Sequence, residues 1–298
     1  MKKLLKSSFH LLVKKSPVLA SHLLYIRTFR RRLRLRNPQT INEKLMWLKL
    51  YEKNPLKSKY ADKLKVRDYV SACGYRHILI DLIDVYDNAE AINFSKLPNR
   101  FILKCTHGSG YNLICFDQAT FPHNQARAIL EEWQRENYGL NWAELHYCEI
   151  QPRIIAEKLL EYDGDVPLDY HIHCFHGKPR LIEVQIQDDY LLFNEHWELL
   201  PFNEASKKFC GTLPKPQKFE EMLEIAKTLS TPFTYVRVDL YDAYNQIYFS
   251  ELTFTPAACL DADFIDDADY IVGEMLDLKK VACKKGKQAQ YELAVKRK

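Results

Sequence analysis

The spacing of apolar residues along the chain predicts helices interleaved with short strands. Apolar positions in residues 125–137 recur with the i, i+3, i+4, i+7 spacing of an amphipathic helix. Residues 40–43 form a capping box, so we expect a second helix to begin there. We also expect helices over residues 61–74, closed by a glycine, and from about residue 216 to 226.

Short apolar runs predict strands at residues 78–86, 100–105 and 153–162, and two hairpins at residues 169–187 and 235–254. Strands mixed with helices and antiparallel hairpins predict an α+β fold with two lobes.

The domain organisation follows from these elements. We expect residues 37–160 to form a first lobe and residues 161–278 a second lobe. A basic amphipathic segment, residues 1–36, and a basic tail, residues 279–298, flank the two lobes.

Charge is distributed unevenly. Residues 1–36 contain eleven Lys or Arg and no acid, and residues 279–298 contain eight bases and one acid. The stretch between them has 24 bases and 38 acids. Basic ends suit anionic partners such as a lipid surface or an anionic polymer, and we see no pattern for a specific nucleic acid.

The N-terminal stretch leaves two alternatives open. A helical wheel places five apolar residues on one side: Leu4, Leu5, Phe9, Leu11 and Leu12. The opposite side carries four lysines: Lys2, Lys3, Lys6 and Lys14. Such a helix either lies on an anionic membrane surface or packs on the body of the protein with its lysines in water. The arginine-rich run at residues 30–36 favours the first alternative.

The cysteines and the apolar runs indicate the compartment. Eight cysteines are dispersed without a C-x-x-C pair or a zinc-site spacing. No apolar run approaches the ~18 residues of a membrane-spanning helix. We therefore expect a cytoplasmic protein, with its basic ends available to the inner face of a membrane.

Three charged residues interrupt the apolar hairpin at residues 235–254. Arg237 and Asp239 share one strand face, because side chains alternate across a strand. One register pairs Asp239 with Glu251 and Arg237 with Thr253, and a slip of two residues pairs Arg237 with Glu251. Two neighbouring carboxylates suit a magnesium ion. Taken alone, however, the stretch favours a solvated salt bridge on an exposed face.

A glycine-rich loop follows a strand that carries a lysine. In FILKCTHGSG, Lys104 precedes Gly108, Ser109 and Gly110, whose backbone amides are suited to approach a phosphate. The motif is neither a Walker A loop nor G-x-G-x-x-G, and an ordinary turn remains an alternative. Further along, Glu157 and Lys158 stand inside an apolar strand, which suits either the edge of a cleft or a solvated strand end.

In this order, the three segments resemble the ATP-grasp superfamily, in which two lobes hold ATP between them. The resemblance implies an ATP site formed by Lys63, Lys104, Gly108, Ser109, Gly110, Glu157, Lys158 and Leu160. The glycine-rich loop would cover the phosphates, and Glu157 to Leu160 would form the hinge that holds adenine. Asp163 or Asp165, just past the hinge, would bind the ribose.

The same resemblance implies a site for two magnesium ions at Asp239, Glu251 and Thr253, with Arg237 as the catalytic residue beside the reacting phosphoryl group. Thr253 departs from the family pattern, which has Asn at this position. Two histidines, His107 and His171, are further candidates, and the family has a lysine where His171 stands.

A closer resemblance, to the TupA-like ATP-grasp proteins, covers most of residues 37–278. Seven segments carry it in order: NPQTINEKL, ADKLKVRDYV, LPNRFILKCTHGSG, PRIIAEKLL, DYHIHCFHGKPRLIEV, PFTYVRVDLYD and IYFSELTFTP. This resemblance implies an ATP- and magnesium-dependent ligase of bacterial surface-polysaccharide synthesis. Its partners would be a carboxylated sugar or polysaccharide and an amino acid or amine, joined as an amide through an acyl phosphate. A sugar kinase and a non-catalytic polyanion-binding protein are the alternatives.

Overall fold

The computed structural model describes residues 2–162, 166–186 and 189–281, and side chains from residue 6 onward. Its α-helices are α1 (Lys2–Lys15), α2 (Pro17–Phe29), α3 (Ile41–Tyr51), α4 (Pro55–Ala61), α5 (Lys65–Ala72), α6 (His123–Arg135), α7 (Glu204–Lys208), α8 (Phe219–Ser230) and α9 (Ala268–Glu274). Its strands are β1 (Leu82–Tyr86), β2 (Phe101–Cys105), β3 (Asn112–Cys115), β4 (Ile154–Lys158), β5 (Leu168–Phe175), β6 (Lys178–Ile186), β7 (Asp189–Asn194), β8 (Tyr235–Ala243) and β9 (Gln246–Thr253). Most of the predicted basic tail lies outside the described residues.

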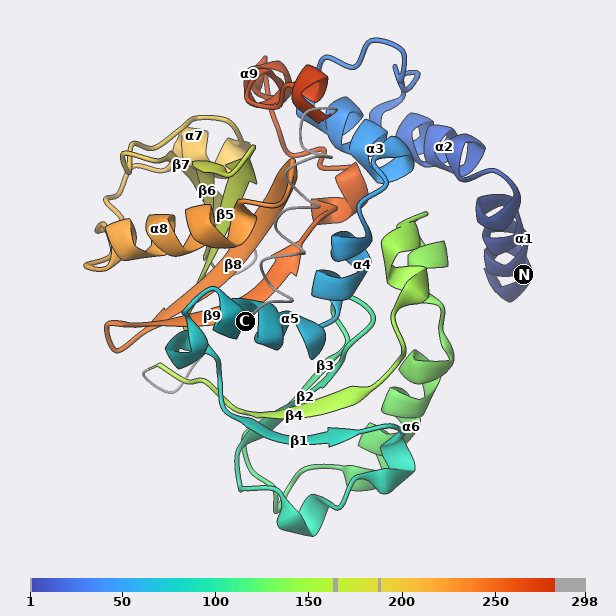
Figure 1. The fold of residues 1–298 in the computed structure, drawn as a ribbon, viewed down its shortest axis with the longest axis vertical. Coiled ribbons are helices and arrows are strands. Elements are labelled where there is room, and N and C mark those ends of the chain that lie inside the picture. The colour runs from blue at the N-terminus through green and yellow to red at the C-terminus, as the bar shows by residue number, and fades with distance from the viewer. Residues whose placement is uncertain (1, 163–165, 187–188, 282–298) are drawn as a thin grey trace.

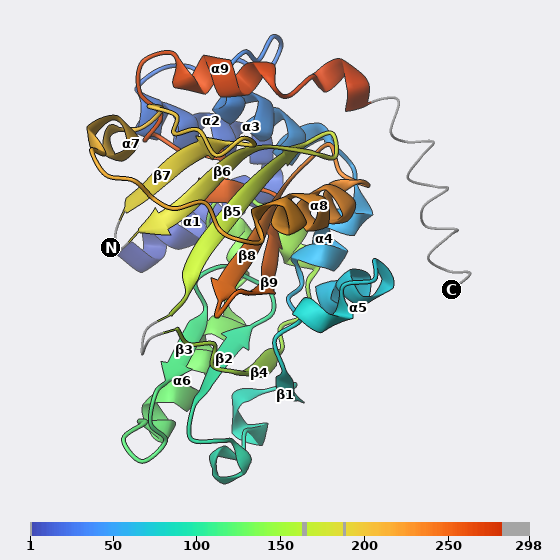
Figure 2. The same cartoon turned by 90° about the vertical axis from the view of Figure 1, so that its left-hand side faces the viewer.

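A four-stranded antiparallel sheet occupies one end of the molecule, at the bottom of Figures 1 and 2. Its strand order is β1-β4-β2-β3. Helix α6 packs on it through Ala126 and Leu130, which share a core with Phe101 and Leu103 of β2. The predicted helix at residues 125–137 and the three predicted strands are confirmed, with shifted ends.

A five-stranded antiparallel sheet forms the larger part, in the order β7-β6-β5-β8-β9. Val236, Val238 and Leu240 of β8 point to one face, where Met222 and Ile225 of α8 complete the core. Helix α8 crosses this face in both ribbon views (Figures 1 and 2).

Both predicted hairpins are confirmed. Their two-residue turns, His176–Gly177 and Tyr244–Asn245, have positive φ at every position, as type I′ turns require.

The opposite face of the large sheet is only partly covered. Tyr235 and Phe175 pack there with Ile41 of α3 and Val272 of α9. Where these helices end, the same face continues with polar residues toward the small sheet, and these residues form the candidate site described below.

Residues 41–72 belong to the core of the large sheet. The predicted capping box is present, with Thr40 and Glu43 bonded to each other's backbone at the start of α3. Helix α3 packs against the face of the five-stranded sheet that carries Tyr235 and Phe175. Helices α4 and α5 pack against the other face, which α8 also covers. We assigned this stretch to the first lobe, but it packs with the five-stranded sheet of the second lobe. The predicted boundary near residue 160 stays a prediction.

The helix predicted over residues 61–74 is interrupted. Helix α4 ends at Ala61, and α5 begins only at Lys65. The side chain of Asp62 accepts hydrogen bonds from the backbone N–H groups of Leu64 (2.9 Å) and Lys65 (3.3 Å), which forms a turn in place of a helix. Gly74 follows the end of α5 with φ +92°, as predicted.

The N-terminal helices pack on the body of the protein. Val13 is buried with Ala20 and Leu140, and Phe9 packs against them. Lys6 forms an ion pair of 2.7 Å with Glu136. These contacts fit the packed alternative, although Leu11, expected on the apolar side, is 54% exposed. Binding to a membrane surface stays a prediction, and no helix in the described ranges is long and apolar enough to cross a bilayer.

Candidate active site

The polar face of the five-stranded sheet carries a row of ionisable side chains from four adjacent strands. His171 lies opposite Glu183 on one side and Asp239 on the other, and Asp239 lies opposite Glu251. Arg237 lies opposite Thr253, which is the first of the two registers that we considered. The four residues Arg237, Asp239, Glu251 and Thr253 are therefore brought together as predicted.

A β-bulge produces this register. Leu240 pairs with Phe249, but Asp239 pairs with Glu251, so the ladder shifts by one residue between Asp239 and Leu240. Without the shift, Glu251 would project from the apolar face, because side chains alternate along a strand. The bulge thus places the second carboxylate beside the first.

Asp239 and Arg237 form a two-bonded ion pair in a buried setting. The guanidinium Nε and one terminal nitrogen each donate a hydrogen bond of 2.8 Å to the two Asp239 oxygens. Burial opposes the charge on Arg237, yet Asp239 and Glu183 together raise its pKa. The hydroxyl oxygen of Thr253 lies 3.1 Å from Asp239 and 2.9 Å from Glu251, and thus between the two carboxylates.

Glu251 is paired with Lys63, which lies in the turn between α4 and α5. The Lys63 ammonium lies 2.8 Å from Glu251 Oε2 and donates a second hydrogen bond of 2.8 Å to the Gly108 carbonyl. Burial favours the neutral acid, but Lys63 outweighs it and lowers the Glu251 pKa to about 2. The Asp62 turn at the start of α5 holds Lys63 in this position.

The glycine-rich loop after β2 is fixed at its base and open at its tip. The Thr106 carbonyl accepts a hydrogen bond from the Lys63 backbone, whereas Ser109 and Gly110 are exposed. A Cβ on Gly108 would lie 2.8 Å from the Tyr138 ring, so only glycine fits there. Gly110 adopts φ +75°.

Lys104 and Glu157 face each other between β2 and β4. The Lys104 ammonium lies 2.9 Å from one Glu157 oxygen, and Arg67 lies 2.8 Å from the other. The Glu157 carboxylate is buried, whereas Lys158 is exposed at the end of β4 and Leu160 is half-buried. Asp163 and Asp165, the expected ribose ligands, lie outside the described residues.

The two candidate histidines have different surroundings. His107 is buried with Nε2 3.0 Å from the Trp133 carbonyl, and burial lowers its pKa, as in a structural histidine. His171 lies 2.7 Å from Glu183 and 3.2 Å from Asp169. Burial and Arg237 oppose its charge, but Asp239, Asp169 and Glu183 raise its pKa to about 10. His171 is therefore a cation within a cluster of carboxylates.

Sequence reasoning missed several residues of the site. Asp169 and Glu183 belong to the same polar face, and the alternation within the hairpin at residues 169–187 was the signal that could have revealed them. Glu144 and Tyr138 come from the irregular stretch between α6 and β4, and no sequence pattern marks them.

Two cavities meet at Arg237. The larger, about 390 Å³, contacts Ser109, Arg237, Glu251 and Thr253 of the predicted set. The smaller, about 130 Å³, also contacts Arg237, and the turn containing Ala257 lines both. Arg237 is thus a wall residue common to the two cavities.

The donor set fits magnesium. Two carboxylates and one hydroxyl are hard oxygen ligands, and magnesium commonly binds through one or two carboxylates plus phosphate oxygens and water. Within the part of the chain that the structure describes, no three His, Cys, Asp or Glu side chains are grouped as a complete metal site. Protein ligands alone would therefore leave most of the coordination to nucleotide and water.

Comparison with known proteins agrees with this architecture. The TupA-like ATP-grasp family matches residues 43–277, so the chain belongs to this family. No curated protein sequence matches the chain.

Solved structures with a similar fold include ligases from three bacteria. D-Alanine–D-alanine ligase from Bacillus anthracis, complexed with ATP, is 16% identical over 76% of this chain and 67% of that chain, with a TM-score of 0.45. L-Amino acid ligase from Bacillus licheniformis is 10% identical over 79% and 55%, with a TM-score of 0.48. D-Alanine–D-alanine ligase from Helicobacter pylori is 13% identical over 82% and 68%, with a TM-score of 0.43.

Proposed function

We propose that this protein couples an amino acid or amine to a carboxylated sugar through an amide bond, in the synthesis of a bacterial surface polysaccharide. ATP would activate the sugar carboxylate as an acyl phosphate. The observation that carries the proposal is the group formed by Arg237, Asp239, Thr253, Glu251 and Lys63 beside a cavity of about 390 Å³.

The ATP site would lie between the two sheets. Lys63 and Lys104 neutralise phosphate charge, and the loop from Gly108 to Gly110 closes over the phosphates. The hinge from Glu157 to Leu160 holds the adenine. Lys63 forms an ion pair with Glu251, and Lys104 forms one with Glu157, so both buried ammonium groups have a carboxylate partner. The phosphates of ATP would replace these carboxylates as partners of the two lysines.

Asp239, Thr253 and Glu251 would hold two magnesium ions. Magnesium supplies neutralisation of the phosphate charge as the phosphoryl group moves. Arg237 holds Asp239 in position and lines both cavities, and it would stabilise the developing negative charge on the acyl group.

The proposed chemistry has two steps. A carboxylate oxygen of the sugar attacks the γ-phosphorus, and ADP leaves with the electron pair of the broken P–O bond. The substrate ammonium first gives one proton to water, and the resulting neutral amine attacks the acyl carbon. The C–N bond forms, and inorganic phosphate leaves with the electron pair of the C–O bond. The nitrogen gives its remaining extra proton to water.

The test is a reaction of the purified protein with ATP, magnesium, uronic acids or uronic-acid glycans and the common amino acids. We expect ADP release that requires both partners and a product heavier than the sugar by the amino acid less water. A phosphoester product without an amine would instead identify a sugar kinase, and no ATP-dependent stabilisation would indicate a non-catalytic protein.

A further inference from the structure

Glu144 is a buried carboxylate on the wall of the larger cavity. It lies just before the 3₁₀ segment Leu145–Glu149 and is 3% exposed. One of its oxygens accepts a hydrogen bond from the Thr255 hydroxyl. The other oxygen, Oε2, has no hydrogen-bond partner among the described residues. An unsatisfied buried carboxylate oxygen is costly unless a ligand completes it.

Among the described residues, no cation forms an ion pair with this carboxylate. Lys49 is the basic residue that influences it, but the Lys49 ammonium is held by the backbone carbonyls of Ala258 (3.0 Å) and Trp142 (3.2 Å). In the described ranges, no Lys, Arg or His nitrogen lies within 4.0 Å of Glu144. Burial raises the Glu144 pKa to about 7, and Thr255 and Lys49 offset this only in part.

Aromatic rings form the wall next to Glu144. Tyr138, Trp142 and Tyr147 all line the cavity, and the rings of Tyr138 and Tyr147 are 5.0 Å apart in an edge-to-face arrangement. The faces of aromatic rings attract cations, and the strength of this attraction increases when water is excluded. The Trp142 side chain is 44% exposed, so it borders the entrance and the solvent.

The remaining charges of the cavity favour the same ligand. Among its lining residues, Arg237 is matched by Asp239 and Glu251 is matched by Lys63, which leaves Glu144 as the charge without an ion-pair partner among the described residues. An anionic substrate would meet uncompensated negative charge near Glu144. An ammonium group would satisfy Glu144 Oε2 and contact the rings at once.

The backbone of the turn at Ala257 and Ala258, which also lines the cavity, is strained. Ala257 and Ala258 have φ of 44° and 56°, in the left-handed region that alanine rarely adopts. This turn presents the Ala258 carbonyl to Lys49 and so keeps the lysine on the backbone.

We propose that the larger cavity is the subsite of the amine substrate and that Glu144 binds its ammonium group against Tyr138, Trp142 and Tyr147. The cavity ends at Arg237 and Glu251, so the amine is held beside the place where the acyl phosphate forms. This assignment rests on the proposed ligase function for its role, but the binding of an ammonium group can be measured without catalysis.

The experiment uses the full chain labelled with 5-fluorotryptophan, with the Trp142 resonance identified through Trp142→Phe. The probes are n-propylammonium and n-propanol, which have similar size and differ in charge. We expect propylammonium to shift the Trp142 resonance with an affinity at least tenfold higher than that of propanol. Glu144→Gln should abolish this difference, while Glu149→Gln, an exposed acid in the same segment, should keep it.

Two outcomes would overturn the subsite. One is equal effects of the two probes in the unaltered protein. The other is a preference for the ammonium that Glu144→Gln retains, which would point to Glu251 instead if Glu251→Gln abolishes it. The comparison in the unaltered protein stands even where a variant fails to fold. Failure of the proposed ligase function gives a different result. The protein would then not be stabilised by ATP and magnesium, whereas the propylammonium titration would still show the preference for the ammonium.

Discussion

Lys63 and Glu251 form an ion pair of 2.8 Å although 188 positions separate them in the chain. Their proposed partners have opposite charge. The lysine is the candidate ligand of phosphate, and the carboxylate is the candidate ligand of magnesium. Each side chain therefore balances the charge of the other, and binding of nucleotide and metal would replace this ion pair. The pair also ties the glycine-rich loop to the large sheet, since Lys63 donates to the Gly108 carbonyl as well.

This pair makes acid stability dependent on Lys63. The Glu251 pKa is lowered from 4.5 to about 2, so its ionised form stabilises the fold above pH 4.5, and this stabilisation is lost as pH falls through 2. In Lys63→Met the buried carboxylate loses its main partner, and its pKa should rise. Urea unfolding between pH 7 and pH 3 should show a smaller loss of stability in the variant than in the unaltered protein.

The control for this measurement is Lys227→Met on α8, whose lysine pairs with Glu224 at the surface. That variant should follow the unaltered protein at every pH. Parallel pH profiles for Lys63→Met and the unaltered protein would show that the ion pair does not set the Glu251 charge.

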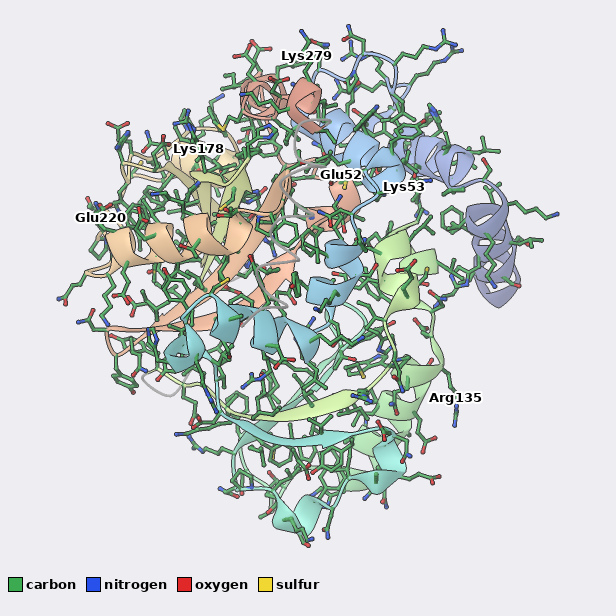
Figure 3. All side chains as sticks on the ribbon, viewed as in Figure 1. Glu52, Lys53, Arg135, Lys178, Glu220 and Lys279 are labelled. Carbon is green, nitrogen blue, oxygen red and sulfur yellow. The ribbon has the colours of Figure 1, made fainter. Side chains whose placement is uncertain are left out.

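Glu251→Gln should remove activity, and it should also lower the free energy of unfolding, because the buried Lys63 ammonium loses its charged partner. The amide keeps the shape of the side chain but loses the charge that a magnesium ion requires, and we expect a fall in kcat/KM of at least about 100-fold, which corresponds to about 3 kcal/mol. The measurement is ADP release at saturating magnesium. Glu220→Gln, at an exposed position on α8 that points away from both sheets (Figure 3), should be unchanged. A normal rate in Glu251→Gln would remove Glu251 from the metal site.

The hairpin of residues 235–254 shows how far the sequence alone reaches. Alternation placed Arg237 and Asp239 on one face, and this is confirmed. The position of Glu251 depended on a one-residue bulge that no local pattern reveals, because bulges are set by the fit of the whole sheet. The resemblance to a family supplied what periodicity lacked, namely that Glu251 belongs with Asp239.

Contacts between distant segments were the part that could not be predicted. The turn that aims Lys63 arises because Asp62 bonds to the backbone and ends a pattern that otherwise reads as a continuous helix. Glu144 acquires its setting from Thr255, which is 111 residues away in the chain. Such pairings depend on tertiary packing, and a single sequence carries no local signal for them.

His171 should contribute stability that disappears in alkaline solution. Its pKa is raised from 6.5 to about 10, so the stabilisation by its charge is complete below pH 6.5 and is lost as pH rises through 10. The difference in unfolding free energy between the unaltered protein and His171→Gln should therefore shrink from pH 6.5 to pH 10. Chemical denaturation across this range measures it, with the exposed His196→Gln as control. A difference that does not change with pH would mean that His171 is neutral in the fold.

Gly108→Ala should destabilise the glycine-rich loop mainly through contact with the Tyr138 ring, with a second contact of 3.0 Å to the Tyr111 ring. Gly108 does not have positive φ, so the backbone accepts alanine, but the new Cβ would lie 2.8 Å from the Tyr138 ring. Relief of this overlap requires the loop to move, and we expect a cost of about 1–3 kcal/mol in urea unfolding. The same movement would lengthen the bond from Lys63 to the Gly108 carbonyl and weaken stabilisation of the protein by ATP and magnesium.

A double-mutant cycle isolates that contact. In a Tyr138→Ala background the ring is absent, so Gly108→Ala should cost clearly less than in the unaltered protein. An equal cost of Gly108→Ala with and without the Tyr138 ring would show that the glycine is required for a reason other than its close approach to the ring.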